Sequence, residues 1–201
     1  MDRFKNKYRI ASARAQWWNY GWNGAYFITI CTQNREHFFG EIVGGKINLS
    51  NTGVIADIFW HEIPTHAPFV KLGDFMVMPN HIHGILILDK PDRGNGTDAD
   101  VETLHATSLR KQRQPQSPDP DHPSAKNEQM AAISPKPNTI STIIRSYKSA
   151  VSKHATRLNL PNGWQTRYHD HIIRDDAEYQ RISDYIIQNP SRWQDDKFYT
   201  T

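Results

Sequence analysis

Hydrophobic and polar positions along the chain form short patterned runs that predict both strands and helices. β-Branched and aromatic residues dominate five segments typical of strands with a buried face: 25–33, 37–43, 46–49, 69–78 and 81–88. Gly44-Gly45 lies between the second and third segments and predicts a tight hairpin. Pro79-Asn80 breaks the last two into a strand pair. These segments account for most of the first half of the chain.

Other segments carry apolar residues at helical spacing. Val54, Ile55, Ile58, Phe59 and Ile63 predict an amphipathic helix over 51–63, capped by Ser50 or Asn51. A second helix begins after Thr139, where the apolar positions are Ile140, Ile143, Ile144, Tyr147, Ala150 and Val151. We expect Tyr147 to face the core. A final helix runs from about 176 to 189, and Pro190 ends it because the residue before proline resists the α region.

The composition changes sharply between Asp89 and Asn138. Pro, Asp, Gln, Ser and Asn dominate there, and the segment holds seven of the twelve prolines. Such a stretch lacks the apolar content to build a core, and it exceeds the usual length of a connection between elements. We therefore expect a basic, Trp-rich arm at 1–24, one domain made of 25–88 and 139–201, and a disordered or weakly ordered insertion at 89–138.

Composition narrows the class of protein only in part. The 201 residues suit one domain, and the net charge of +3 with a pI near 8.9 permits nucleic-acid binding without demanding it. A lone cysteine, Cys31, excludes an intramolecular disulfide and a Cys-rich zinc site, and we expect it to be a small buried residue. We find no signal peptide or membrane span in the sequence, so we expect a cytoplasmic protein.

The arm and one helix supply candidate contacts to nucleic acid. Basic residues interleaved with tryptophans suit phosphate pairing beside base stacking, and the alternative is an extension that packs its tryptophans on the domain. The candidate DNA-binding residues are Arg3, Lys5, Lys7, Arg9, Arg14, Trp17, Trp18, Arg145 and Lys148.

The segment His81-Ile82-His83 is a candidate metal-binding segment. Residues at i and i+2 of a strand project from the same face, so the two imidazoles lie side by side on a rigid element. Imidazole is the commonest protein ligand of transition metals, and the pair would make half of a divalent-metal site. The alternative for so short a pattern is two strand histidines without a ligand.

A second pair lies on the final helix, where Tyr185 and Asn189 share a face at i and i+4. Together these pieces resemble the single-tyrosine HUH transposases, and most closely their REP-associated branch. The resemblance rests on four blocks that follow the family's order and span nearly the whole chain outside the insertion: Tyr26-Phe27-Ile28-Thr29, Met78 to Gly84, Trp164-Gln165 with His171, and Asp184 to Pro190.

The resemblance implies an α+β fold with a central, mainly antiparallel sheet and helices packed on its faces, the ferredoxin-like palm of HUH nucleases. It implies a DNA strand transferase that cleaves and rejoins single-stranded DNA at hairpin-flanked sites through a 5′-phosphotyrosine on Tyr185. By the same resemblance His81, His83 and Asn189 hold magnesium or manganese, and His171 and Gln188 support the site. Many insertion-sequence members carry Gln where this chain has Asn189. Relatives act as dimers or alone, so the sequence leaves open a homodimer and whether Tyr185 serves its own subunit.

Two other functions compete with this one. A binder of hairpin nucleic acid descended from such a transposase would use the same surfaces without cleavage, although it would have little physical reason to keep His81, His83 and Tyr185. A metal-dependent hydrolase that activates water would not need Tyr185. Covalent capture of DNA separates the hydrolase from the transposase.

Overall fold

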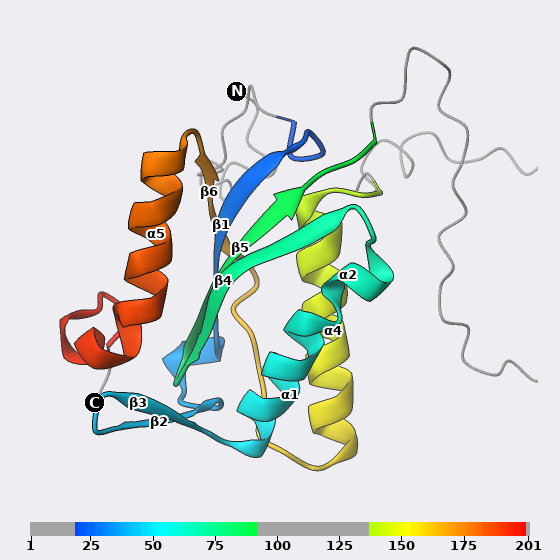
Figure 1. Cartoon of the computed structure of the whole chain (residues 1–201). Helices are drawn as coiled ribbons and strands as arrows, with labels where there is room; N and C mark the ends of the chain where they lie inside the picture. Colours follow the sequence, from blue (N-terminus) through cyan, green and yellow to red (C-terminus); the bar gives the residue numbers. More distant parts are fainter. Residues whose placement is uncertain (1–18, 92–136, 200–201) are drawn as a thin grey trace, which may run out of the picture. The chain divides into compact units, whose positions relative to one another are not determined.

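The computed structural model describes residues 19–91 and 137–199. Within these residues a four-stranded antiparallel sheet runs in the order β4-β5-β1-β6 (Figure 1). Its strands are β1 (Gly24–Cys31), β4 (Val70–Met78), β5 (His81–Leu88) and β6 (His169–Ile173). The two central strands, β1 and β5, pair along their whole length, from Gly24 opposite Leu88 to Cys31 opposite His81.

Helices cover both faces of this sheet (Figure 1). One face packs against α1 (Asn51–His61) and α4 (Ile140–Arg157), which bury the larger core around Tyr26, Trp60 and Tyr147. The short helix α2 (Ile63–His66) follows α1, because Pro64 suits the first turn of a new helix and disrupts the old one. Side-chain oxygens cap α1 and α4: Ser50 accepts from the Gly53 amide, and Thr139 forms a capping box with Thr142.

The opposite face of the sheet lies under α5 (Asp176–Gln188), which is capped by the Asp175 carboxylate. The apolar side of α5 adds Ile182 and Ile186 to a smaller core with Ile85 and Ile173. A 3-10 helix, η3 (Asn189–Asp195), continues directly from α5, with Pro190 in its first turn. The remaining elements are the 3-10 turn η2 (Gln33–Arg35) and the separate hairpin of β2 (Gly40–Val43) and β3 (Lys46–Leu49).

The structure confirms the predicted α+β class with a mainly antiparallel central sheet. It also confirms that Cys31 and Tyr147 are buried, at 2% and 3% exposure. Strand β6 was not predicted, because the polar residues of its sequence, HDHII, mask the extended pattern at this sheet edge. The predicted arm lies almost wholly outside the described residues, as does most of the predicted insertion. Among the described helices, none combines the length and apolar character that a membrane span needs.

Close packing at Gly84 leads to a prediction about stability. An added Cβ at this position would lie 2.3 Å from Cζ2 of Trp60, whose side chain is fully buried and stacks on Phe75. Overpacking of this kind costs about 1–3 kcal/mol, so Gly84→Ala is expected to lower the free energy of unfolding by that amount in urea. Trp60→Phe frees the same space, so the double variant should lose less than the sum of the single losses. Additive losses would contradict this explanation.

Candidate functional site

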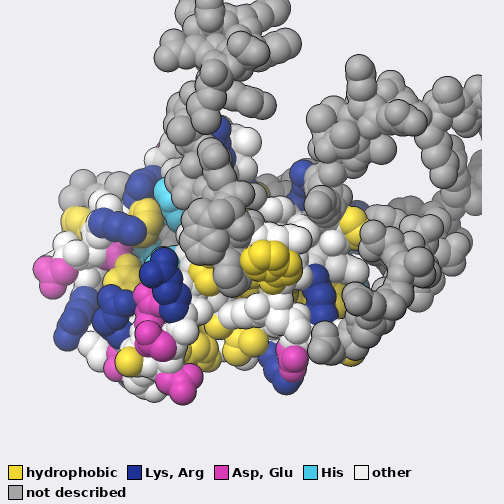
Figure 2. Space-filling view, turned by 90° about the horizontal axis from the view of Figure 1, so that it is seen from above, with side chains coloured by type: hydrophobic (Ala, Val, Ile, Leu, Met, Phe, Trp, Pro, Cys, Tyr) yellow, Lys and Arg dark blue, Asp and Glu magenta, His cyan; other side chains and the backbone are white. Residues whose placement is uncertain are grey.

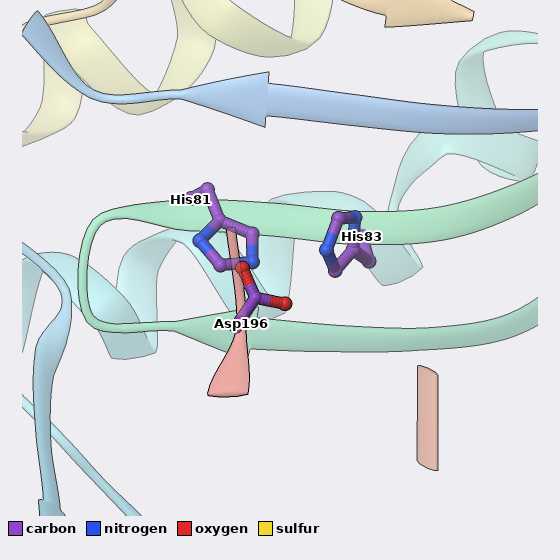
Figure 3. Close-up of side chains that lie close together, drawn as sticks. All are labelled: His81, His83 and Asp196. Atoms are coloured by element: carbon purple, nitrogen blue, oxygen red, sulfur yellow. The ribbon is translucent and has the colours of Figure 1, made fainter. Parts of the chain in front are cut away.

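Strand β5 places both predicted histidines on the sheet face that α5 covers. His81 lies opposite Cys31 and His83 lies opposite Thr29 in the neighbouring strand β1. The two-residue repeat of a strand puts Ile82, between them, into the opposite core. Both imidazoles are completely buried, and their ring centroids lie 4.4 Å apart. Figure 3 shows the two rings on one side of the strand, with the Asp196 carboxylate close to them.

Hydrogen bonds orient each imidazole. The Asn80 side-chain oxygen lies 2.8 Å from Nδ1 of His81, and the Asn80 amide nitrogen donates to the Phe198 carbonyl at 2.9 Å. Because an amide oxygen only accepts, Nδ1 of His81 carries the proton and Nε2 keeps its lone pair. That Nε2 atom is buried without a hydrogen-bond partner. Nδ1 of His83 lies 2.8 Å from the Thr29 hydroxyl, which leaves its Nε2 facing the helix.

Helix α5 brings Tyr185 to this Nε2 atom. The Tyr185 hydroxyl lies 3.1 Å from Nε2 of His83, and the phenol ring contacts Phe27 edge-on. Tyr185 is 40% exposed, so it borders both solvent and the buried imidazoles. Asn189 lies one turn later, as the predicted i, i+4 spacing requires, with its side-chain nitrogen 2.5 Å from Oδ2 of Asp196. The Asn189 side-chain oxygen is buried and has no hydrogen-bond partner.

Asp196 joins the site from the end of the chain. Its Oδ2 accepts hydrogen bonds from the Tyr185 hydroxyl at 2.8 Å and from Asn189, and its Oδ1 accepts from the Phe198 amide. Ligand atoms of His81, His83 and Asp196 all lie within 4.8 Å of one another. Sequence analysis missed Asp196. The signal that could have found it was an acidic pair, Asp195-Asp196, between aromatic residues just beyond the tyrosine helix.

Burial controls the protonation of these groups. Removal from water lowers the pKa of His81 to about 3, with a smaller effect from the positive charges of Arg35 and Lys197. Burial also lowers the pKa of His83 well below its usual value. Both imidazoles are therefore neutral at pH 7, the form that binds a metal. The pKa of Tyr185 is raised, mainly by burial and then by the Asp196 carboxylate, so its hydroxyl keeps its proton.

A cavity of about 480 Å³ opens beside Tyr185. Its walls come from α5 and from the chain that follows it, including Gln188 and Asn189 from the predicted site and Asp195 and Asp196 from the unpredicted segment. The exposed side of Tyr185 therefore faces a space that could admit a substrate.

The other predicted residues lie elsewhere. His171, on β6, pairs with Glu178 near the start of α5 at 2.8 Å. Arg145 is exposed on α4, which covers the opposite face of the sheet, and the Lys148 ammonium donates to the Gln165 carbonyl at 2.6 Å. The arm residues predicted to contact DNA, which are Arg3, Lys5, Lys7, Arg9, Arg14, Trp17 and Trp18, lie outside the described residues.

Comparisons with known proteins find a relative by sequence and solved structures that resemble the chain. An uncharacterized protein of Haemophilus influenzae is 32% identical over 189 residues, which cover 94% of this chain and 92% of the relative. A solved REP-associated tyrosine transposase bound to a REP hairpin shares the fold at a TM-score of 0.53 and 17% identity, over 92% of this chain and 74% of that one. A Deinococcus radiodurans protein proposed to be a transposase is too distant for argument, at a TM-score of 0.36 and 14% identity, over 88% of this chain and 96% of that one. No family model matches the chain.

Proposed function

Because the chain belongs to the same family as the Haemophilus influenzae protein and shares the fold of a tyrosine transposase, we propose that it is a single-stranded DNA transposase. It would cleave and rejoin DNA at sites flanked by hairpins, through a covalent link between Tyr185 and a 5′ phosphate. The transposase with this fold was solved with a REP hairpin, which supports a hairpin as the partner proposed here.

The observation that carries the proposal is the position of the Tyr185 hydroxyl. It lies 3.1 Å from Nε2 of His83 and 2.8 Å from Oδ2 of Asp196, at the border between solvent and buried polar groups. A tyrosine that only filled space would have no reason to end on an imidazole and a carboxylate. An attacking nucleophile needs a group within hydrogen-bonding distance to take its proton, and Asp196 satisfies this requirement.

The surrounding donors fit a divalent cation. Nε2 of His81 is a buried lone pair without a partner, and the Asn189 oxygen is also unpartnered. Together with His83 and Asp196 they form a mixed nitrogen and oxygen set, which suits manganese and accommodates magnesium. When bound, such a cation supplies electrostatic stabilisation to a phosphate and makes its phosphorus more electrophilic. Asp196 extends the predicted ligand set of His81, His83 and Asn189.

The residues of the chain account for a balanced reaction. The Tyr185 oxygen forms a bond to phosphorus while the bond from phosphorus to the 3′ oxygen breaks. The phenolic proton passes first to Asp196, and the departing 3′ oxygen ends as a hydroxyl after gaining one proton. The phosphotyrosine keeps the energy of the original diester, so a second 3′ hydroxyl can displace Tyr185 and rejoin the strand without ATP.

A test of the proposal uses one DNA sequence in two forms. With manganese, a hairpin with single-stranded flanks is expected to give a covalent protein–DNA adduct on a denaturing gel, whereas the fully paired duplex stays intact. A paired strand holds its phosphates in a rigid helix, whereas attack by Tyr185 needs a phosphate in a flexible strand.

The outcomes separate the candidate functions. Hairpin binding without an adduct or any cut would favour the non-catalytic binder. Cleavage without an adduct would favour the metal-dependent hydrolase. Equal cleavage of hairpin and duplex would contradict the preference for single strands.

A further inference from the structure

Two cations lie beside the imidazole site around one aromatic ring. Phe198 is buried, and its ring lies 4.7 Å from that of His81 and 5.7 Å from that of His83. The Arg35 guanidinium lies 4.5 Å from the centre of the Phe198 ring, and the Lys197 ammonium lies 4.8 Å from it. Cation–π attraction therefore holds two positive charges around a ring that lies close to both histidines.

The backbone fixes Arg35 in this place. It ends the turn η2, where Asn34 and Arg35 both adopt left-handed φ angles, of 52° and 60°. This conformation is unfavourable for an arginine and persists only where its surroundings impose it. Thr32, just before the turn, donates from both its amide and its hydroxyl to the Asn80 carbonyl, at 2.9 Å each. Because Asn80 also contacts His81 and Phe198, the Arg35 turn is tied directly to the site.

Neither cation forms an ion pair with a residue that the structure describes. Among described residues, the pairs within 4.0 Å join Lys71 to Asp89 and Glu178 to His171 and Arg181. Arg35 is half-buried and Lys197 is exposed, and no described carboxylate lies within 4.0 Å of either. Two cations without an ion pair among the described residues, around a ring that lies close to both histidines, favour an anionic ligand.

The exposed surface of α5 does not carry an excess of positive charge that would attract an anion. Figure 2, seen from above the view of Figure 1, shows Lys and Arg side chains mixed with Asp and Glu on the side where α5 lies. The helix carries Asp176 and Asp184 as well as Arg181, all exposed. No broad basic patch therefore lies on the described part of this helix. The cavity beside Tyr185 is lined by Arg181, which pairs with Glu178, and by Arg192, together with the acidic residues Asp184, Asp195 and Asp196.

We propose that Arg35 and Lys197 bind the phosphate that Tyr185 attacks and position it against the two imidazoles. This inference rests on the proposed function. A phosphodiester carries one negative charge on two free oxygens, which suits a guanidinium from one side and an ammonium from another. Arg35 and Lys197 are thus positioning residues that recognise the DNA backbone and carry no sequence information.

The test measures binding rather than cleavage. Full-length protein with Tyr185→Phe is titrated with a flanked hairpin in which each flank phosphate, one at a time, is replaced by an uncharged methylphosphonate. At one linkage the replacement is expected to weaken binding about tenfold. When Arg35→Gln and Lys197→Gln are both present, the same replacement should cost less than about twofold, because both contacts are already lost, and either substitution alone should reduce the tenfold effect.

Matched variants control for general charge and for folding. Lys153→Gln removes one exposed cation from α4, on the other face of the sheet, and should leave the methylphosphonate effect unchanged. Arg35→Lys and Lys197→Arg keep the charge and should retain most of the effect. Thermal unfolding of each variant checks that the fold is intact. Each lost contact should also reduce the salt dependence of log K by about 0.7 for a single strand.

The results distinguish this inference from the proposed function. An adduct in the wild-type protein together with full methylphosphonate sensitivity in Arg35→Gln and Lys197→Gln would overturn the phosphate-binding role alone. Linkage-specific sensitivity that depends on Arg35 and Lys197, without any adduct in the wild type, would support the role and refute the transposase.

Discussion

Tyr185→Phe is expected to abolish the covalent protein–DNA adduct and strand cleavage while hairpin affinity changes by less than about threefold. Only the hydroxyl is removed, and that oxygen forms the new bond to phosphorus in the proposed reaction. The ring contacts to Phe27 and His83 survive the change, so the helix should stay in place. A denaturing gel measures the adduct, and a titration with labelled hairpin measures affinity.

Tyr179→Phe is the matched control for this experiment. Tyr179 lies on the same helix, six residues before Tyr185, and its hydroxyl packs close to Gly73 of β4. Its loss should leave the adduct at the wild-type level. An adduct that persisted in Tyr185→Phe would refute the assignment and point to Tyr199, which is 38% exposed. The buried Tyr147 would not be the substitute, because its hydroxyl donates to the Ala56 carbonyl.

Replacing either histidine is expected to produce the second large effect. Loss of a residue that only supports a metal ligand lowers metal affinity or activity by about 10- to 100-fold. His81→Ala and His83→Ala remove ligands themselves, so each should lower the cleavage rate by at least about 100-fold. Chelation of the wild-type protein should have the same result. Direct titration with manganese, followed by its electron paramagnetic resonance signal, measures the loss of metal binding independently of cleavage.

A distant histidine and a stability measurement control this prediction. His66→Ala alters an exposed imidazole at the end of α2 and should change neither manganese binding nor rate. His81 and His83 are fully buried, so their truncation also creates cavities, and the unfolding midpoint of each variant must be compared. A full cleavage rate in excess chelator would refute the metal role, whatever the effect of the substitutions.

Much of the fold was predictable because the patterns that specify it are local. The apolar spacing of 51–63 predicted a helix, and Asn51–His61 forms one with Ser50 as its cap. The strand predicted at 81–88 has those bounds in the structure. Two details were not predicted. The helix expected to run to residue 63 ends at His61, and α2 begins at Ile63 with Pro64 in its first turn. Strand β6 is held by pairing with β1 rather than by its own composition.

The candidate site likewise combines features that local sequence patterns determine with features that only the tertiary structure determines. Sequence determined that His81 and His83 share one strand face, and that Tyr185 and Asn189 share one helix face, because the repeats of 2 and 3.6 residues follow from backbone geometry alone. Only the tertiary structure decided that these faces meet, with the Tyr185 hydroxyl 3.1 Å from His83. It also placed Asp196 beside the histidines, and Arg35 and Lys197 around the neighbouring Phe198 ring, and no periodic pattern links these residues to the histidines. Their positions depend on turns and hydrogen bonds between segments far apart in sequence, and such contacts leave no local repeat to read.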